Sequence, residues 1–347
     1  MELTRLKEHT PRRIFVLGAT GTIGRATVRA LHAHGHEVVC FVRPRAQRSA
    51  GDAKTQHAPN SDVLPNIAAL PNVTAREGDV RDATSLVREG FRGEHFDAVV
   101  SCMASRTGAP IDAWAVDHAA HMNVLPAAKN AGVTQMILLS AICVQKPLLA
   151  FQQAKLAFER ELMSSGLTWS IVRPTAFFKS LSGQVARAKR GKPFLVFGDG
   201  ALTACKPISD DDLAHFIASC LDNPALQNRV LPIGGPGPAL TPREQGAQLF
   251  ALLGQTPRYK LVPVAFLDVI IGALSTLGRI APKLEEKAQL ARIGRYYATE
   301  SMLVWDAVAN RYDADATPST GADTLADYYA KLLSGAVTDD RGEHAVF

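Results

Sequence analysis

The chain has 347 residues, 47% of them hydrophobic and 20% charged, which is enough to bury the core of one large or two modest globular domains. Its net charge of +5 is small and its basic residues are scattered, which argues against nucleic acid as a partner. The five cysteines are widely spaced without a C-x-x-C pair, which argues against zinc, iron–sulfur and dithiol sites, so we expect no metal cluster.

The first half of the chain alternates between short apolar runs and helical patterns. The apolar runs predict strands at 12–18, 36–43, 72–80, 96–104, 135–141 and 168–174. The patterns between them predict helices at 22–35, 82–90, 112–131 and 149–165. Repeated strand–helix units with β-branched strands indicate a parallel sheet covered on both faces. We therefore predict a Rossmann-type, doubly wound α/β domain over residues 13–180, after an N-terminal tail of residues 1–12.

The regular alternation fades after Leu181. Residues 181–335 predict a smaller, mostly helical C-terminal lobe that binds substrate over the carboxyl edge of the sheet. The polar segment 43–66 predicts a long surface loop. Residues 336–347 predict a polar C-terminal tail.

Residues 262–282 are strongly apolar and raise the question of a membrane. They carry Asp268 and Arg279, and a charge near the centre of a bilayer costs about 2.5–3.5 kcal/mol on insertion scales. We therefore exclude a spanning helix and favour a buried or pocket-lining one, while peripheral membrane contact stays open. The N-terminus MELTRLKEHTPRR lacks the apolar stretch of a signal peptide, so a cytoplasmic location is expected.

Three glycines in the segment GATGTIG form a G-x-x-G-x-x-G pattern between the first strand and the first helix. Gly18 permits a tight turn, Gly21 lets the backbone approach a pyrophosphate, and Gly24 lets the helix pack on the strand. The helix N-terminus adds N–H donors. Because strand, turn and helix follow in the required order, we predict a dinucleotide site here. The residues expected to bind the cofactor are Gly18, Thr20, Gly21, Thr22, Ile23 and Gly24.

The second strand ends without the acidic residue that would hold a free ribose 2′-hydroxyl. HEVVCFVRPR offers Arg43 and Arg45 instead, whose guanidinium groups can bind a 2′-phosphate. Two solvated loop arginines are the alternative. We expect NADPH rather than NADH, and residues 13–180 as the NADPH-binding domain.

The carboxyl ends of the later strands should complete the cofactor site, because ligands of such sheets bind there. The residues expected are Asp79, Val80, Cys102, Ala104, Ser140 and Pro174. The first two should meet the adenine, although Asp79 could equally cap the helix that follows. Cys102 and Ala104 should lie beside the ribose.

Phe151 and Lys155 read F-x-x-x-K where short-chain dehydrogenases carry Tyr-x-x-x-Lys. In that pair, which shares one helix face, the ammonium lowers the pKa of the phenol that exchanges a proton with a carbonyl oxygen. Phe151 cannot donate a proton, whereas Lys155 can still hydrogen-bond the nicotinamide ribose. The residues indicate either a reductase of something other than a simple ketone or a degenerate nucleotide-binding sensor.

A family resemblance is carried by longer runs: LLSAICVQKPLLAFQQAKLAFE, WSIVRPTAFFKSLSGQV, GKPFLVFGDG, ACKPISDDDLA, LPIGGPGPALTPREQG and IGRYYATESML. They closely resemble the NADPH-dependent 8-vinyl reductases of chlorophyll and bacteriochlorophyll synthesis, which are atypical short-chain dehydrogenases. The resemblance implies reduction of the C8 vinyl group of divinyl chlorophyllide or protochlorophyllide to ethyl. Hydride transfer to the vinyl terminus would leave charge delocalised into the macrocycle, with protonation following, so the phenol is not needed.

Such a substrate, a flat apolar macrocycle with a propionate, needs a hydrophobic slot and a cation. The residues expected to bind it are Phe151, Phe177, Phe178 and Lys179. Each aromatic could equally be core, and a solvated lysine is the alternative for Lys179. The catalytic proton is expected from Lys155, Tyr296 or Tyr297, with solvent as a further option. A histidine could bind the central magnesium, but packed or exposed histidines are commoner, so no metal ligand is assigned.

Two rival functions stay open. One is an NADPH-dependent reductase of another conjugated alkene, similar to the isoflavone reductases, and the other is a non-catalytic NADP-sensing regulator. Retention of Lys155 and the long specific runs argue against the regulator. Peripheral membrane contact through residues 262–282 stays open, and the resemblance implies that the membrane would be a photosynthetic one. The oligomeric state is not predicted from the sequence.

Overall fold

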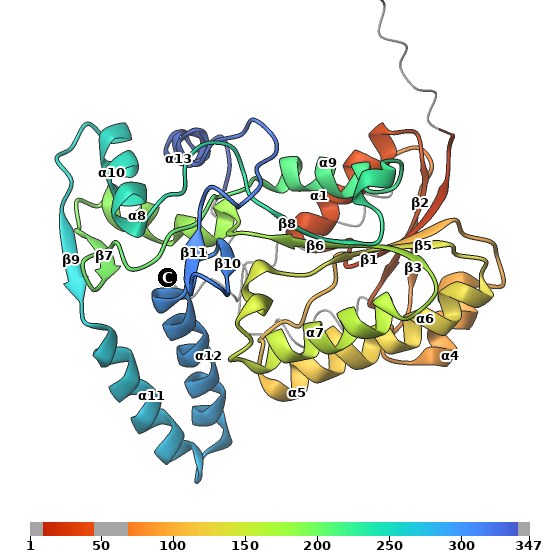
Figure 1. The fold of residues 1–347 in the computed structure, drawn as a ribbon, viewed down its shortest axis with the longest axis horizontal. Coiled ribbons are helices and arrows are strands. Elements are labelled where there is room, and N and C mark those ends of the chain that lie inside the picture. The colour runs from red at the N-terminus through yellow and green to blue at the C-terminus, as the bar shows by residue number, and fades with distance from the viewer. Residues whose placement is uncertain (1–9, 45–68, 339–347) are drawn as a thin grey trace, which may run out of the picture.

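The computed structural model describes residues 10–44 and 69–338 (Figure 1). A parallel sheet of seven strands lies at its centre, in the order β3-β2-β1-β4-β5-β6-β8. The strands are β1 (Arg13–Leu17), β2 (Glu37–Val42), β3 (Val73–Glu77), β4 (Ala98–Ser101), β5 (Gln135–Leu139), β6 (Thr168–Pro174) and β8 (Arg229–Ile233). This order, with helices on both faces, confirms the predicted Rossmann-type doubly wound α/β fold. Most of the predicted tails and of the 43–66 loop lies outside the described residues.

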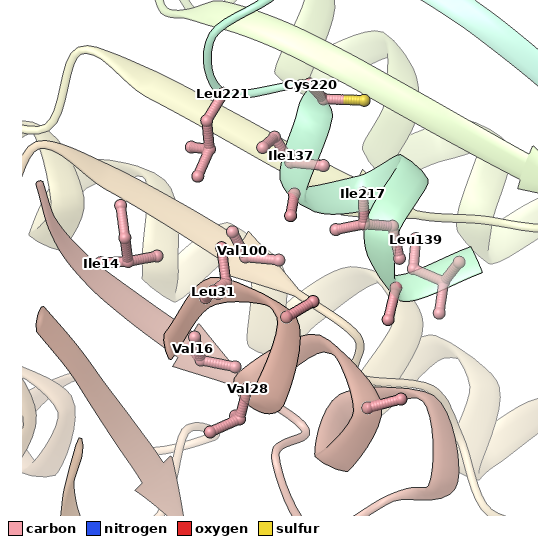
Figure 2. Close-up of a cluster of buried hydrophobic side chains, with 14 of the residues drawn as sticks. Ile14, Val16, Val28, Leu31, Val100, Ile137, Leu139, Ile217, Cys220 and Leu221 are labelled. Atoms are coloured by element: carbon pink, nitrogen blue, oxygen red, sulfur yellow. The ribbon is translucent and has the colours of Figure 1, made fainter. Parts of the chain in front are cut away.

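One face of the sheet is covered by α1 (Thr22–Ala33) and α9 (Asp210–Ser219), which also pack against each other. Ile14 and Val16 of β1 belong to the core beneath these helices, and Figure 2 shows them with Ile217 of α9. All three are fully buried, and full burial of such a side chain stabilises the fold by about 1.5–3 kcal/mol. This core fixes α1 against β1, between which the glycine segment lies.

The opposite face is covered by helices from the first half of the chain. They are α4 (Ala83–Ser85) with the π-helical turn η2 (Leu86–Phe91), the continuous run α5 (Pro110–Ala113), η3 (Trp114–Ala120) and α6 (His121–Asn130), and α7 (Ala150–Met163). Phe15 of β1 stacks on Phe91 beneath them, with ring centroids 4.2 Å apart. The π-helical η3 packs against α7, which brings two helices of the candidate site together.

The remaining short elements are η4 (Ile142–Gln145), η5 (Phe178–Gln184), α8 (Val185–Lys189), β7 (Phe194–Phe197), η6 (Pro224–Leu226), α10 (Pro242–Leu252), β9 (Tyr259–Val262), β10 (Val304–Asp306), β11 (Arg311–Asp313) and α13 (Leu325–Ser334). Most of them form a lobe whose core includes Phe250 and Tyr329. The chain returns to the main sheet through α9 and β8, a strand that the sequence pattern did not predict. The domain boundary at residue 180 stays a prediction.

A long hairpin of α11 (Val264–Gly278) and α12 (Pro282–Thr299) extends from the lobe, away from the sheet (Figure 1). None of the residues of α11 is buried, because α12 is its main packing partner. Phe266 and Val269 are 56% and 68% exposed. The favoured expectation of a buried or pocket-lining helix over 262–282 is therefore wrong. Within the described residues, no helix is long and apolar enough to cross a bilayer.

Candidate functional site

A cavity of about 530 Å³ lies at the carboxyl edge of the main sheet, between the sheet and the lobe. The glycine segment and the ends of β4, β5 and β6 form one wall, while β7 and α12 contribute to the other. The lining is mainly apolar, which is typical of sites for large organic ligands. The predicted site residues that line the cavity are Gly21, Thr22, Ile23, Gly24, Cys102, Ala104, Ser140, Phe151, Lys155, Pro174, Phe177, Lys179 and Tyr297.

The glycine segment has the geometry that a dinucleotide requires. Gly18 has a φ of +77°, and a Cβ on Gly18 would lie 2.6 Å from the carbonyl carbon of Cys102. A Cβ on Gly24 would lie 2.0 Å from the carbonyl oxygen of Gly18. Gly21 is the N-cap of α1, no side chain caps this end, and the first turn carries no acidic residue. The first-turn N–H groups can therefore receive a pyrophosphate.

Lys179 lies at this phosphate end of the cavity. Its Nζ donates a hydrogen bond to Thr22 Oγ1 at 3.0 Å. The structure thus brings the predicted propionate partner to the glycine segment. Asp210 lines the cavity as well, and burial raises the pKa of its carboxyl to about 6, against the attraction of Lys179. Asp210 was missed because three consecutive aspartates after Ser209 indicate only the start of a helix.

The described residues that were predicted to bind the adenine and its ribose phosphate do not line the cavity. Arg43 is exposed just after β2, and Arg45 lies outside the described residues. Asp79 accepts hydrogen bonds from Arg81 at 3.0 and 2.8 Å, and this ion pair lowers the pKa of Asp79, with a smaller contribution from Arg43. Asp82, not Asp79, caps the helix that follows. The described residues of the predicted cofactor set that do not line the cavity are Gly18, Thr20, Arg43, Asp79 and Val80.

Lys155 is held by a residue that the sequence did not reveal. Its Nζ donates to Asp117 Oδ1 at 2.9 Å, and the backbone N–H of Ser105 donates to the same oxygen at 3.1 Å. Lys155 is 9% exposed and lines the cavity, whereas Asp117 is 2% exposed and lies behind it. The available signal was an acidic residue inside the predicted helix 112–131, which does not say that it faces Lys155.

His121 lies near this ion pair without reaching the cavity. Its Nε2 is 2.8 Å from Ser101 Oγ, and its Nδ1 is 3.0 Å from the carbonyl oxygen of Val116. Burial lowers its pKa to about 4, so the ring is neutral at physiological pH. His118 packs its ring against Trp114 instead. Neither histidine lines the cavity.

The predicted aromatic residues divide between the cavity and the core. Phe151 and Phe177 both line the cavity, and Phe151 is only 9% exposed. Phe178 points into the core of the lobe, where its ring lies 5.6 Å from that of Tyr328. The slot for a ligand is therefore bounded by the first two aromatics.

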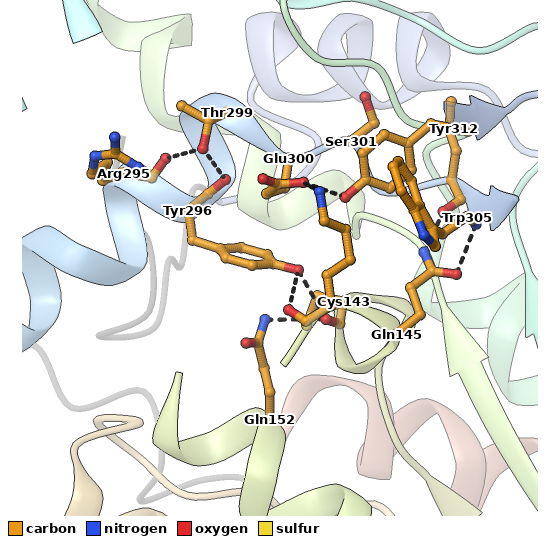
Figure 3. Close-up of polar contacts among 12 residues, drawn as sticks. Cys143, Gln145, Gln152, Arg295, Tyr296, Thr299, Glu300, Ser301, Trp305 and Tyr312 are labelled. Carbon is orange, nitrogen blue, oxygen red and sulfur yellow. Dashed lines mark hydrogen bonds and ion pairs between the residues drawn. The ribbon is translucent and has the colours of Figure 1, made fainter. Parts of the chain in front are cut away.

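The two neighbouring tyrosines of α12 have different environments. Figure 3 shows the Tyr296 hydroxyl bound to backbone carbonyls, that of Cys143 at 2.9 Å and that of Lys146 at 3.1 Å. Tyr297 lines the cavity, with its hydroxyl 4.0 Å from Cys143 Sγ. Burial raises the pKa of the Tyr296 phenol, and the ordinary phenol pKa of about 10 already keeps both tyrosines protonated at physiological pH. Of the two, Tyr297 alone reaches the cavity.

Other polar groups of the wall formed by the glycine segment and the ends of β4, β5 and β6, here called the cofactor wall, are directed away from the cavity. Ser140 Oγ donates to Glu159 Oε1 at 2.5 Å, and Glu159 forms an ion pair with Arg173. Cys102 Sγ contacts Thr27 Oγ1 at 3.5 Å, and burial raises the pKa of this thiol to about 11. This wall therefore offers a ligand mostly backbone and apolar surface.

Comparison with known proteins gives this site its context. A family described as NAD(P)H-binding matches residues 18–224, more than half of the chain. The divinyl chlorophyllide a 8-vinyl-reductase of Cucumis sativus is 47% identical over 350 residues, covering 99% of this chain and 81% of that protein. The protein of the same name from Arabidopsis thaliana is 45% identical, covering 95% and 79%. The chain belongs to the divinyl chlorophyllide a 8-vinyl reductase family.

This membership confirms the resemblance and the prediction of an NADPH-dependent oxidoreductase. The names of both relatives describe them as chloroplastic. Solved structures of low sequence identity show the same fold. AtPrR2 with NADP+ and (+)pinoresinol has a TM-score of 0.68 at 17% identity, covering 93% of this chain and 99% of that one. An isoflavone reductase has a TM-score of 0.65 at 20% identity, covering 93% and 100%.

Proposed function

We propose that this reductase converts the 8-vinyl group of divinyl chlorophyllide or protochlorophyllide to an ethyl group, with NADPH as the reductant. The observation that carries the proposal is Phe151 beside Lys155 on one wall of an apolar cavity. Reduction of a carbonyl needs a proton donor beside the oxygen, whereas reduction of a conjugated vinyl group leaves the charge in the macrocycle. A cavity that keeps the lysine and lacks the phenol suits the second reaction. The names of the relatives support the same substrate class.

We assign the cofactor to the wall formed by the glycine segment and the ends of β4, β5 and β6. When bound, NADPH supplies the hydride. The first turn of α1 would bind the pyrophosphate, with Lys179 adding a positive charge. Lys155 would donate to the nicotinamide ribose, and Arg43 would bind the 2′-phosphate. The remaining contacts are assigned to Asp79, Val80, Cys102, Ala104, Ser140 and Pro174.

The macrocycle is assigned to the space between Phe151 and Phe177 on one side and β7 and α12 on the other. Phe178 would support this wall from the core. Tyr297 is the proton donor that we favour, because its protonated phenol lines the cavity. The Tyr296 hydroxyl is already bound to two carbonyls, which suits a structural role.

The direct test is the absorption spectrum of divinyl chlorophyllide, and separately of divinyl protochlorophyllide, incubated with the pure protein and NADPH. Loss of one conjugated vinyl group should shift the Soret band to shorter wavelength, and the shift should need NADPH. An unchanged spectrum, under conditions where NADPH binding is detected, would rule the proposal out.

Lys155→Met should cut the rate of that reaction by about 100-fold or more, because it removes the ammonium from the cofactor wall. Lys331→Met is the matched control, since Lys331 is exposed on α13 and does not line the cavity. Its rate should stay within about two-fold of wild type. A fully active Lys155 variant would remove that residue from the mechanism.

We also propose that the α11–α12 hairpin gives the protein peripheral contact with a membrane surface, consistent with relatives named as chloroplastic. Val269 is 68% exposed on α11 and Ile280 is 88% exposed at its end, next to the exposed cation Arg279. An apolar face edged by positive charge suits insertion among anionic headgroups.

Flotation with vesicles of neutral lipid, with and without anionic lipid, tests this contact. Wild type should float with the anionic vesicles, and Val269→Asp combined with Ile280→Asp should abolish flotation. Val308→Asp is the control, because Val308 is 98% exposed in the turn between β10 and β11. Equal flotation of all variants would exclude the hairpin as the contact.

A further inference from the structure

Within residues 10–44 and 69–338, the carboxylate partner of the Lys155 ammonium is Asp117, which comes from a different helix. The Nζ to Oδ1 distance is 2.9 Å, and the Asp117 side chain is fully buried. The same oxygen accepts the backbone N–H of Ser105, in the segment that leaves β4. Asp117 therefore ties together the end of β4, the π-helical turn η3 and α7.

The second oxygen of Asp117 has no hydrogen-bond partner among the described residues, although it is buried. Burying a carboxylate oxygen without a hydrogen bond costs free energy of folding. A buried carboxylate that carries this cost therefore calls for a functional explanation. Its ionic partner among the described residues is Lys155, which lines the cavity while Asp117 does not. Any effect of Asp117 on a ligand therefore passes through Lys155.

We propose that Asp117 is a positioning residue, which holds the Lys155 ammonium in place on the cofactor wall. This inference rests on the proposed function only for the reaction that follows, because the pair can be tested on cofactor binding alone. The π-helical turn η3 contributes to this positioning, because its backbone sets the direction in which the Asp117 side chain faces α7.

The other titratable groups around Lys155 do not replace this carboxylate. Among the described residues, His121 on α6 and Cys143 on η4 both feel the charge of Lys155. Burial lowers the pKa of His121 and raises the pKa of Cys143, so both are neutral at physiological pH. Without Asp117, the ammonium would lack a carboxylate partner among the described residues, and its direction toward the cofactor wall would no longer be fixed.

Asp117→Asn is the primary test, with NADPH affinity measured by protein–cofactor fluorescence. The dissociation constant should rise by about 10-fold relative to wild type, because the ammonium loses the charge-assisted hydrogen bond that positions it. Asp112→Asn is the matched control on the same helical run. Asp112 accepts hydrogen bonds from the N–H and Oγ1 of Thr107 at 2.8 and 3.0 Å but does not contact Lys155.

A purely structural role would affect Asp112→Asn and Asp117→Asn alike, and that result overturns the proposal. If wild type binds NADPH but reduces no vinyl group, the proposed function fails while this test still decides the role of Asp117.

A double variant keeps the test decisive if Asp117→Asn does not fold. Lys155→Gln and Asp117→Asn together replace the ion pair by two amides of similar size. Because Asp117 acts through Lys155, the double variant should bind NADPH as Lys155→Gln alone does, within about two-fold. A further ten-fold loss in the double variant would show that Asp117 acts on the cofactor by another route and would overturn the proposal.

Discussion

The two walls of the cavity hold their side chains in different ways. On the cofactor wall, polar groups are paired with partners behind the wall, as Lys155 is with Asp117 and Ser140 is with Glu159. The lobe wall consists mostly of apolar residues of β7 and α12, with Tyr297 among them. Fixed polar contacts suit a cofactor of constant shape, while an apolar slot suits a macrocycle. In the proposed function, the first wall would bind the cofactor, and the second would bind the macrocycle and supply the proton through Tyr297.

Gly24→Ala should damage the cofactor wall most. The added Cβ would lie 2.0 Å from the carbonyl oxygen of Gly18, so the glycine segment must shift. We expect NADPH affinity to fall by about 10-fold or more and thermal stability to fall by about 1–3 kcal/mol. Fluorescence titration and thermal unfolding measure the two effects.

Gly272→Ala is the control for that change, because nothing lies within 4 Å of a Cβ at Gly272 in α11. It should leave NADPH affinity unchanged and stabilise the protein by about 0.5–1 kcal/mol. If Gly24→Ala binds NADPH like wild type, the glycine segment is not the phosphate site.

Lys179→Met tests whether Lys179 binds the cofactor or the propionate of the substrate. Its ammonium lies 3.0 Å from Thr22 Oγ1, so we expect NADPH to bind about 10-fold more weakly in the absence of substrate. Isothermal titration with NADPH alone gives this value. Unchanged NADPH affinity with a raised KM for the chlorophyllide would return Lys179 to the propionate, as the sequence first indicated.

Asp210→Asn tests the electrostatics at the phosphate end. The pKa of Asp210 is raised to about 6, so the folded state prefers the neutral carboxyl. Its stabilising effect is complete below the ordinary pKa of about 3.9 and is lost as the pH rises through about 6. Asp210→Asn should therefore stabilise the protein at pH 7, by no more than about 3 kcal/mol, and have little effect at pH 4.

The neighbouring Asp211→Asn controls for that substitution, because Asp211 is exposed and pairs with Arg29 at 2.8 Å. Thermal unfolding at the two pH values compares both variants. Equal stabilisation of Asp210→Asn at pH 4 and pH 7 would contradict the raised pKa.

The cofactor wall could be predicted from the sequence where its signals are local. Gly18, Gly21 and Gly24 follow a strand and open a helix, and Phe151 and Lys155 share one helix face at i and i+4. The Asp117–Lys155 pair joins residues 38 positions apart, and no spacing rule connects them. The same limit hid Asp210 at the phosphate end.

The second half of the chain was harder to predict, because local spacing does not show what its segments pack against. β8 is an edge strand that contains Pro232, and a short apolar run with proline resembles a loop. The apolar pattern of α11 indicated burial, but in a hairpin that extends from the lobe its main packing partner is α12. An apolar pattern gives the character of a face and not the identity of its partner.

Phe151→Tyr should have the smallest effect and gives the closest comparison of the two walls. The change restores the phenol of Tyr-x-x-x-Lys at a ring that lines the cavity four residues before Lys155. Because the electrons of vinyl reduction pass into the macrocycle, no oxyanion forms that would need a proton from the phenol. The rate should therefore stay within about two-fold of wild type. Phe177→Tyr places the same hydroxyl on another cavity residue and controls for added polarity. A ten-fold faster rate in Phe151→Tyr alone, measured by the Soret shift, would mean that proton delivery from the cofactor wall limits the reaction. The chemistry would then resemble that of the carbonyl reductases after all, and the role we give to Tyr297 on the lobe wall would be lost.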